Sequence, residues 1–235
     1  MGMVMEETKT EVAILNANIN AIKSRNGNIT PKTSIKYLGY YLQSNLKIDK
    51  TVDALVSRIN QMAGRIWQFP CMPVKCKVTL YYAYVHSLLM SNAACILPFI
   101  TPQQTIKLQR ACNNAIRAIV TLRWRKNDSK PKSISKIRLK LGIPSVAELA
   151  QRTVALETWK NRLKLEEAAK NIKPRYYTRY GHQLKAPIEV GPTKWSIWPK
   201  LVKSWNELPA EIKTCSELKR AKALIKKLYS NHTLQ

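Results

Sequence analysis

The sequence predicts a mainly α-helical protein, in which a short N-terminal β-hairpin precedes a helical bundle and a second, smaller helical C-terminal region. Three observations carry this prediction. Apolar residues recur at helical spacing through most of the chain after residue 49. Three capping-box sequences mark helix starts. Extended runs with turn residues are confined to 1–48, so the predicted segments are 1–48, 49–125, a basic linker 126–144, and 145–235.

The first segment is predicted to contain strands and turns. Glu11–Leu15 is a short apolar run, and Asn26–Gly27 is a strong hairpin signal because both residues tolerate positive φ. Ser34–Leu42 is predicted as a second extended element, in which Gly39 marks a bulge or a close approach of the backbone. Because an isolated hairpin is marginally stable in water, we expect this segment to be the least stable part of the chain.

Two helices are predicted next, separated by the proline-bearing sequence Pro70–Pro73. The first, over 51–69, has an apolar stripe at helical spacing, which consists of Val52, Leu55, Val56, Ile59, Met62, Ala63 and Ile66. The second, around Val74–Met90, places on one face Val78, Tyr81, Val85, Leu88 and Leu89.

The third helix has a capping box at Thr101–Gln104 with proline at its first position. Its predicted apolar stripe consists of Leu108, Cys112, Ala115, Ile116 and Ile119. The opposite side carries Lys107, Arg110, Asn114 and Arg117. The sequence therefore predicts a helix with one face for a core and one face for an anion.

The rest of the chain alternates irregular and helical sequence. Thr121–Pro144 is strongly basic and is predicted as a linker or an exposed binding loop, and 171–192 is predicted to be irregular. A capping box at Ser145–Glu148 opens a helix whose stripe is Val146, Leu149, Ala150, Thr153, Leu156, Trp159 and Leu163. A final helix from Thr214 turns inward Leu218, Ala221, Leu224, Ile225 and Leu228.

The charge restricts the class of partner. Forty Lys and Arg against fourteen Asp and Glu give +26, which favours nucleic acid first and an anionic membrane surface second. The uncharged run between Lys77 and Lys107 is long enough to span a bilayer, but it is interrupted by His86, Asn92 and Pro98. We therefore expect a buried helix followed by a loop, and no membrane partner.

The cysteines and the first residues indicate an intracellular protein. The five cysteines are odd in number and scattered, so we expect free thiols, no metal site, no cofactor and a reducing compartment, nucleus or cytoplasm. The first residues carry acids without a long apolar core, so no signal peptide is expected.

Catalytic chemistry is poorly represented. His86, His182 and His232 lie far apart, the carboxylates are sparse, and the sequence has neither a glycine-rich phosphate loop nor a nucleophile elbow. An independent enzyme is therefore not expected.

Nucleic-acid binding is better represented, because cations neutralise phosphates and an aromatic ring between them stacks on a base. The predicted binding residues are Lys107, Arg110, Arg117, Arg123, Trp124, Arg125, Lys126, Lys136, Arg138 and Lys140. For any single one of these residues, an ordinary solvated basic surface remains the alternative.

Several sequences, in the same order along the chain, resemble the end of a non-LTR (LINE-type) retrotransposon reverse transcriptase. Lys9–Glu11 is similar to motif D, and Lys36, Tyr37, Leu38 and Gly39 are similar to the primer-grip hairpin, motif E. The run 51–122 resembles the thumb, including LYYAYVHSLL and LQRACNNAIRAI. LGIPSVAELAQR and WPKLVKSWNELPAEI resemble segments that follow the thumb.

The resemblance implies a thumb-like bundle that cradles RNA or an RNA–DNA duplex, and it makes Lys36–Gly39 primer-grip-like. The catalytic aspartates of that family lie in motifs upstream of motif D, and this sequence has no Tyr/Phe-x-Asp-Asp motif. We therefore expect a non-catalytic, nucleic-acid-binding fragment, whose further partners are the rest of a reverse transcriptase or a ribonucleoprotein. The alternative is a recruited structural or RNA-binding component of a ribonucleoprotein, or a regulator of related retroelements. RNA versus DNA preference and oligomeric state stay open.

Overall fold

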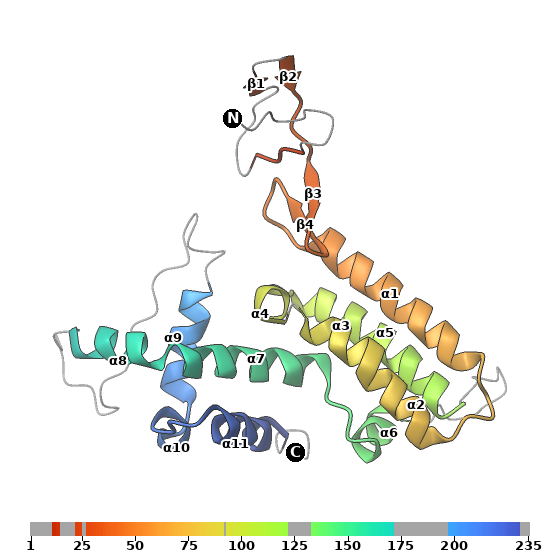
Figure 1. Ribbon diagram of the computed structural model, residues 1–235. Coiled ribbons are helices and arrows are strands. Elements are labelled where there is room, and N and C mark those ends of the chain that lie inside the picture. The colour runs from red at the N-terminus through yellow and green to blue at the C-terminus, as the bar shows by residue number, and fades with distance from the viewer. Residues whose placement is uncertain are drawn as a thin grey trace, which may run out of the picture. The chain divides into compact units, whose positions relative to one another are not determined.

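The computed structural model describes residues 11–14, 22–24, 27–91, 93–121, 133–171 and 197–230 (Figure 1). Within them the fold is mainly helical, and short antiparallel hairpins near the N-terminus precede the helices, which confirms the predicted fold class. The chain divides into two compact units, Met1–Arg58 and Ile59–Gln235. This division differs from the four predicted segments, because everything after residue 58 belongs to one unit.

Two hairpins form the strand content of the first unit. β1 (Ile22–Ser24) pairs with β2 (Gly27–Ile29), so that Ser24 lies opposite Gly27. This hairpin lies where the Asn26–Gly27 signal predicts one. The predicted strand Glu11–Leu15 is not formed: residues 11–14 lie outside any strand, and Leu15 lies outside the described residues.

The second hairpin changes the interpretation of Gly39. β3 (Ser34–Tyr37) pairs with β4 (Tyr40–Gln43), and Tyr37 lies directly opposite Tyr40. Leu38 and Gly39 form the two-residue connection, with φ of 46° and 90°. Positive φ at both positions is the mark of a type I′ turn, whose twist matches that of the strands. The prediction of a bulge at Gly39 is therefore wrong, because this glycine is needed in a tight turn.

Thr51 joins the second hairpin to the first turn of helix α1 (Asp49–Trp67). The Tyr41 amide donates to Thr51 Oγ1 at 3.0 Å, and Thr51 Oγ1 donates to the Tyr41 carbonyl at 3.3 Å. The Lys50 amide also donates to Gln43 Oε1 at 2.9 Å. The Lys50 bond satisfies a backbone donor at the helix start that has no partner within the helix, and the two Thr51 bonds hold β4 against it.

The second unit is built from helices, most of them short. Their bounds are α2 Val74–Leu80, the π-helix η2 Tyr81–His86, α3 Ser87–Met90, α4 Ala93–Ile96, the 3₁₀-helix η3 Leu97–Phe99, α5 Pro102–Ile119, α6 Ile134–Lys140, α7 Val146–Lys160, α8 Arg162–Asn171, α9 Trp198–Glu207, α10 Ala210–Lys213 and α11 Leu218–Ser230. The one helix predicted around Val74–Met90 is thus interrupted by a π-helical segment.

Capping boxes begin α5 and α7, as predicted, but the predicted helix start at Thr214 is wrong, because Thr214 is the C-cap residue of α10 and α11 begins at Leu218. Thr101 Oγ1 accepts from the Gln104 amide at 3.2 Å, while Gln104 Oε1 accepts from the Thr101 amide at 2.8 Å. Ser145 and Glu148 repeat the arrangement at α7, at 3.2 Å and 2.8 Å. Each box satisfies two backbone donors, so the chain enters both helices at a defined residue.

The core follows the predicted stripe of α5 closely, whereas Ala150 and Leu156 of the predicted α7 stripe are only half-buried. All five predicted apolar residues of α5 are buried, and Cys112 among them lies beside the buried Tyr81. Burial raises the pKa of Cys112 to about 11 and that of Tyr81 well above its usual range. Helix α7 packs against α5, α9 and α11, and so connects the two ends of this unit (Figure 1).

Two predicted inward residues point to solvent instead. Leu163 is 69% exposed, because α7 ends at Lys160 and a new helix starts at Arg162, which breaks the phase of the stripe. Leu218 is 43% exposed at the first residue of α11. Lys77 shows the opposite departure, since it is buried and donates through Nζ to the Pro70 carbonyl at 3.2 Å.

Two glycines give a matched test of backbone conformation. Gly142 has φ of +66° and ends α6 with a Schellman motif, in which its amide donates to Leu139 O at 3.0 Å and the Ile143 amide to Arg138 O at 3.1 Å. Gly64 lies inside α1, and an added Cβ meets no atom within 4 Å at either glycine. Gly142→Ala should therefore destabilise the protein by about 1 kcal/mol through backbone strain alone.

Gly64→Ala is the control, and it should stabilise the protein by about 1 kcal/mol because alanine is the better helix former. Urea unfolding followed by circular dichroism measures both changes. Equal effects of the two substitutions would contradict the assigned conformations.

Candidate nucleic-acid interface

Helix α5 presents the first group of predicted binding residues on one exposed stripe. Lys107 and Arg110 are exposed, and Arg117 is half-buried. Successive positions three and seven residues apart lie on one side of a helix, so the three cations follow a line about 15 Å long at 1.5 Å per residue. The helix contains no acidic residue, and its opposite side is buried. The structure therefore brings these three predicted residues together.

A chain of amides orients Arg117. Its guanidinium donates from NH1 to Asn114 Oδ1 at 2.9 Å, and Asn114 Nδ2 donates to Asn60 Oδ1 of α1 at 3.3 Å. Both asparagines are exposed. Side-chain amides that accept from a guanidinium hold it without cancelling its charge. Arg117 thus has a fixed direction and remains a full cation, as a phosphate contact requires.

Helix α6 carries three further predicted binding residues, which differ in their exposure. Lys136 and Lys140 are exposed, but Arg138 is only 7% exposed. Its guanidinium lies 3.3 Å from Glu148 Oε2 and donates to the Ile143 carbonyl at 3.1 Å. The prediction that 126–144 is a linker is wrong for 134–140, because these residues form a helix. Arg138 holds α6 to α7 and is removed from the set of phosphate contacts.

The remaining basic and aromatic residues of the predicted set are Arg123, Trp124, Arg125 and Lys126, and they lie outside the described residues. The primer-grip-like set belongs to the first unit. Lys36 and Tyr37 are exposed at the end of β3, and Leu38 is 78% exposed in the turn beside Gly39. These four residues form the tip of one hairpin.

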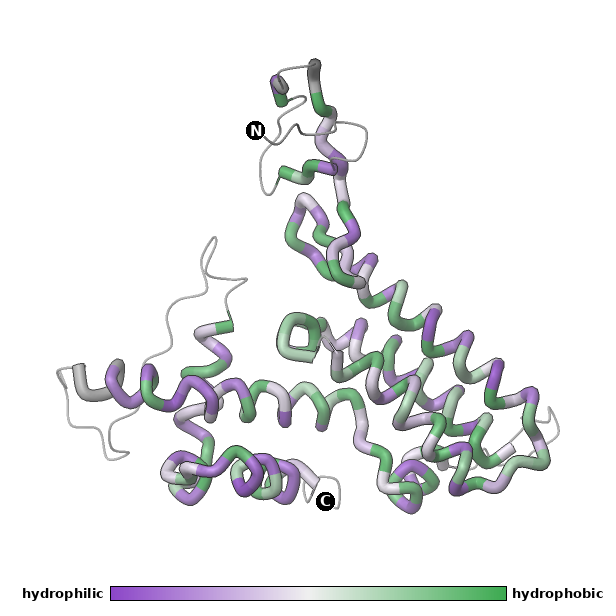
Figure 2. Tube along the Cα trace, in the orientation of Figure 1, coloured by the Kyte–Doolittle hydropathy of each residue, from purple (hydrophilic) through white to green (hydrophobic). Residues whose placement is uncertain are grey.

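A cationic helix that the predicted set does not contain lies at the other end of the chain. Helix α11 exposes five cations and contains no acid, and these residues, here called the α11 cationic face, are Lys219, Arg220, Lys222, Lys226 and Lys227. Figure 2 shows hydrophilic and hydrophobic residues alternating along this helix. The signal was present in the sequence: the inward stripe of the final helix leaves all its lysines on the other side.

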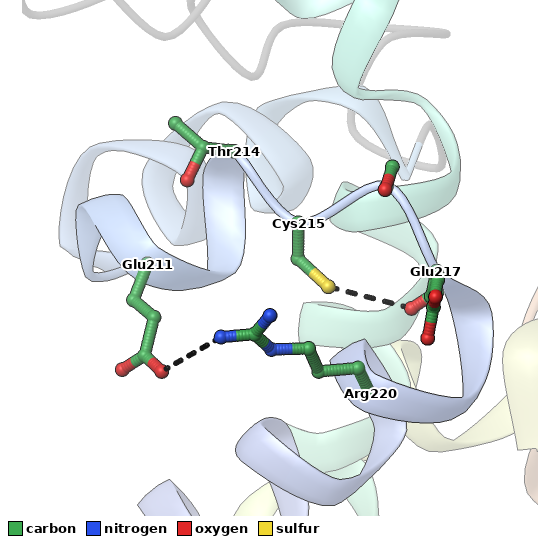
Figure 3. Close-up of a pocket in the computed structure, with 6 residues that line it drawn as sticks. Glu211, Thr214, Cys215, Glu217 and Arg220 are labelled. Atoms are coloured by element: carbon green, nitrogen blue, oxygen red, sulfur yellow. Dashed lines mark hydrogen bonds and ion pairs between the residues drawn. The ribbon is translucent and has the colours of Figure 1, made fainter.

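A shallow polar pocket adjoins the start of α11 (Figure 3). Arg220 NH2 lies 4.0 Å from Glu211 Oε1, and Cys215 Sγ lies 3.4 Å from the Glu217 carbonyl. Both partners of the ion pair are more than half exposed, so their attraction is weak in water. Nearby, burial lowers the pKa of Lys213, which lies over the Trp205 ring.

Within the described ranges, no group of three or more His, Cys, Asp and Glu side chains is arranged to hold a metal ion. None of the helices in the described part, including those between Val74 and Phe99, has the length and apolar character of a membrane span.

Comparison with protein-family models, with curated proteins and with solved structures found no match for the chain. The resemblance to non-LTR retrotransposon reverse transcriptases therefore rests on the quoted sequences alone, and it stays a prediction.

Proposed function

We propose that the chain is a non-catalytic nucleic-acid-binding protein, which cradles RNA or an RNA–DNA duplex through phosphate contacts. The observation that carries this proposal is the stripe of Lys107, Arg110 and Arg117 on an acid-free helix whose other side is buried. A rigid line of cations matches a line of phosphates, and counterion release then supplies affinity without base recognition.

The charge of the whole chain supports the same partner. A net charge of +26 raises the local concentration of a polyanion around the protein and increases its rate of association. All five cysteines are free thiols, two of them buried. Because disulfides are rare where glutathione keeps thiols reduced, we include an intracellular, reducing location, nucleus or cytoplasm, in the proposal.

The test measures how binding of a labelled RNA–DNA duplex depends on salt, by fluorescence anisotropy. Replacing Lys107, Arg110 and Arg117 together by alanine should lower the slope of log K against log salt by about 2 to 3, since each phosphate contact contributes about 0.9. The charge-matched control replaces Lys47, Lys75 and Lys164, all exposed and off this stripe, by glutamine. Its slope should stay near that of the natural chain.

Two results would overturn the proposal. The first is the absence of duplex binding by the natural chain even at about 50 mM salt, where phosphate contacts are strongest. The second is an equal salt slope for the α5 variant and the control, which would show that this stripe is not the contact surface.

A further inference from the structure

Helix α11 is fixed to the protein by its apolar side. Ala221 and Ile225 are fully or nearly fully buried, and they belong to one core cluster with Ala155 and Trp159 of α7. At the other end of α11, Arg152 NH2 of α7 donates to Ser230 Oγ at 2.7 Å. The α11 cationic face is therefore held in one orientation before any partner binds.

Among the described residues, carboxylates leave most of the charges on this face uncompensated. Within the described part of the chain, Lys219, Lys222, Lys226 and Lys227 form no ion pair with a carboxylate, and only Arg220 has one, the loose contact with Glu211. Lys219, Lys222 and Lys226 are spaced three and four residues apart, so they lie on one side of the helix. Such an arrangement carries a repulsive energy that a polyanion would remove.

The packing of the apolar side of α11 favours nucleic acid over an anionic membrane surface as the polyanion. A helix that lies in a membrane surface inserts its apolar face between the lipids, and here that face is already packed against α7. The exposed side offers only Ala223 and the partly exposed Leu218 as apolar residues. Insertion would require α11 to leave the core, whereas phosphate groups of a nucleic acid can bind with α11 in place.

The exposed side also decides how the nucleic acid is contacted. It carries no exposed aromatic ring, since Tyr229 is half-buried and burial raises its pKa. Without a ring there is no platform on which an unpaired base can stack. Lysines contact phosphate as point charges. A duplex has a higher charge density than a single strand, so it is the better partner for such a face.

We propose that the α11 cationic face is a second nucleic-acid contact, which binds the phosphate backbone of a duplex without preference for base sequence. This inference rests on the proposed function for the class of partner. It adds a surface that lies on a different helix from the α5 stripe.

The experiment compares three full-length chains: the natural chain, a variant with Lys219, Lys222, Lys226 and Lys227 replaced by glutamine, and a control with Lys23, Lys47, Lys75 and Lys164 replaced by glutamine. All eight lysines are exposed, and glutamine is nearly as good a helix former as lysine, so circular dichroism should show equal folding. The α11 variant should lower the duplex salt slope by about 2 to 4, at about 0.9 per contact. The control should leave the slope unchanged, and two duplexes of unrelated sequence should respond alike.

The outcomes separate this inference from the proposed function. If the α5 variant lowers the slope while the α11 variant matches its control, the inference falls and the proposed function stands. If the natural chain binds no duplex, both fall. The last arm measures how much protein is retained on vesicles of neutral lipid that contain a fraction of phosphatidylserine. If replacing the four lysines lowers retention on these vesicles but leaves the duplex salt slope unchanged, α11 contacts a membrane, and the inference is overturned.

Discussion

Replacing Glu148 by glutamine is expected to lower the free energy of unfolding by about 3 kcal/mol or more, because the substitution leaves the buried Arg138 guanidinium without its counter-charge. The two side chains are 8% and 9% exposed, so water can do little to screen the charge that remains. For a domain with a typical stability of about 5–15 kcal/mol, such a loss is a large fraction of the total.

The Glu148 carboxylate performs two tasks at once. Its Oε2 atom accepts from the Ser145 amide at 2.8 Å, which completes the capping box of α7, and lies 3.3 Å from Arg138 NH1 of α6. The α7 start is further supported by Gln109 of α5, whose Oε1 accepts from the Val146 amide at 2.9 Å. Glutamine retains an oxygen for the Ser145 amide, whereas Glu148→Ala leaves that amide without its acceptor and should cost about 1 kcal/mol more.

The double variant Arg138→Met, Glu148→Gln tests whether the loss of stability comes from the unpaired guanidinium charge. It removes the uncompensated guanidinium, so its stability should recover part of the loss seen with Glu148→Gln alone. Urea unfolding followed by circular dichroism gives the three free energies. If Glu148→Gln alone changes stability by less than about 0.5 kcal/mol, as an exposed pair would, the buried ion pair assigned here is wrong.

The helices α5 and α7 could be predicted from sequence because their signals are local. A capping box spans four residues, and the stripe that follows repeats every three or four, so neighbouring residues determine both start and phase. Thr101–Gln104 and Ser145–Glu148 each contain that information in full. The line Lys107, Arg110 and Arg117 follows directly, since a buried stripe defines the exposed one.

Helix α6 and the role of Arg138 required information from further along the chain. A cation in a basic segment is usually solvated, and only Glu148, ten residues away, makes this one structural. One local signal was available: Gly142 followed by Pro144 is a typical helix C-terminus, which predicts a helix ending near residue 140.

Exposure was hardest to predict where a helix changes direction. The stripe of α7 continues in sequence to Leu163, but the chain restarts as α8 at Arg162, and the phase is lost.

The cationic residues of α11 posed a different difficulty. In a chain with forty cations, a basic helix is not distinctive until the structure shows which cations have no carboxylate of the described residues beside them.

Trp159→Ala is expected to destabilise the second unit by about 3–5 kcal/mol, the range for removal of a large buried aromatic side chain. The indole is 6% exposed and lies in the cluster formed by Ala155, Leu208, Ile212 and residues of α11. Its Nε1 donates to the Cys215 carbonyl at 2.9 Å, and the Arg162 guanidinium lies 4.2 Å from the ring centre. One side chain thus joins α7 to the segment that leads into α11.

Trp159→Phe is the matched control, because it keeps most of the apolar volume and removes the Nε1 donor. It should cost about 1–3 kcal/mol, the penalty for a buried carbonyl left without its partner. The two variants also have different consequences for binding, since α11 depends on this cluster for its orientation. Trp159→Ala should reduce the contribution of the α11 cationic face to the salt slope even though every lysine remains, whereas Trp159→Phe should preserve it. A salt slope that is unchanged in a destabilised Trp159→Ala protein would mean that α11 binds without being held against α7.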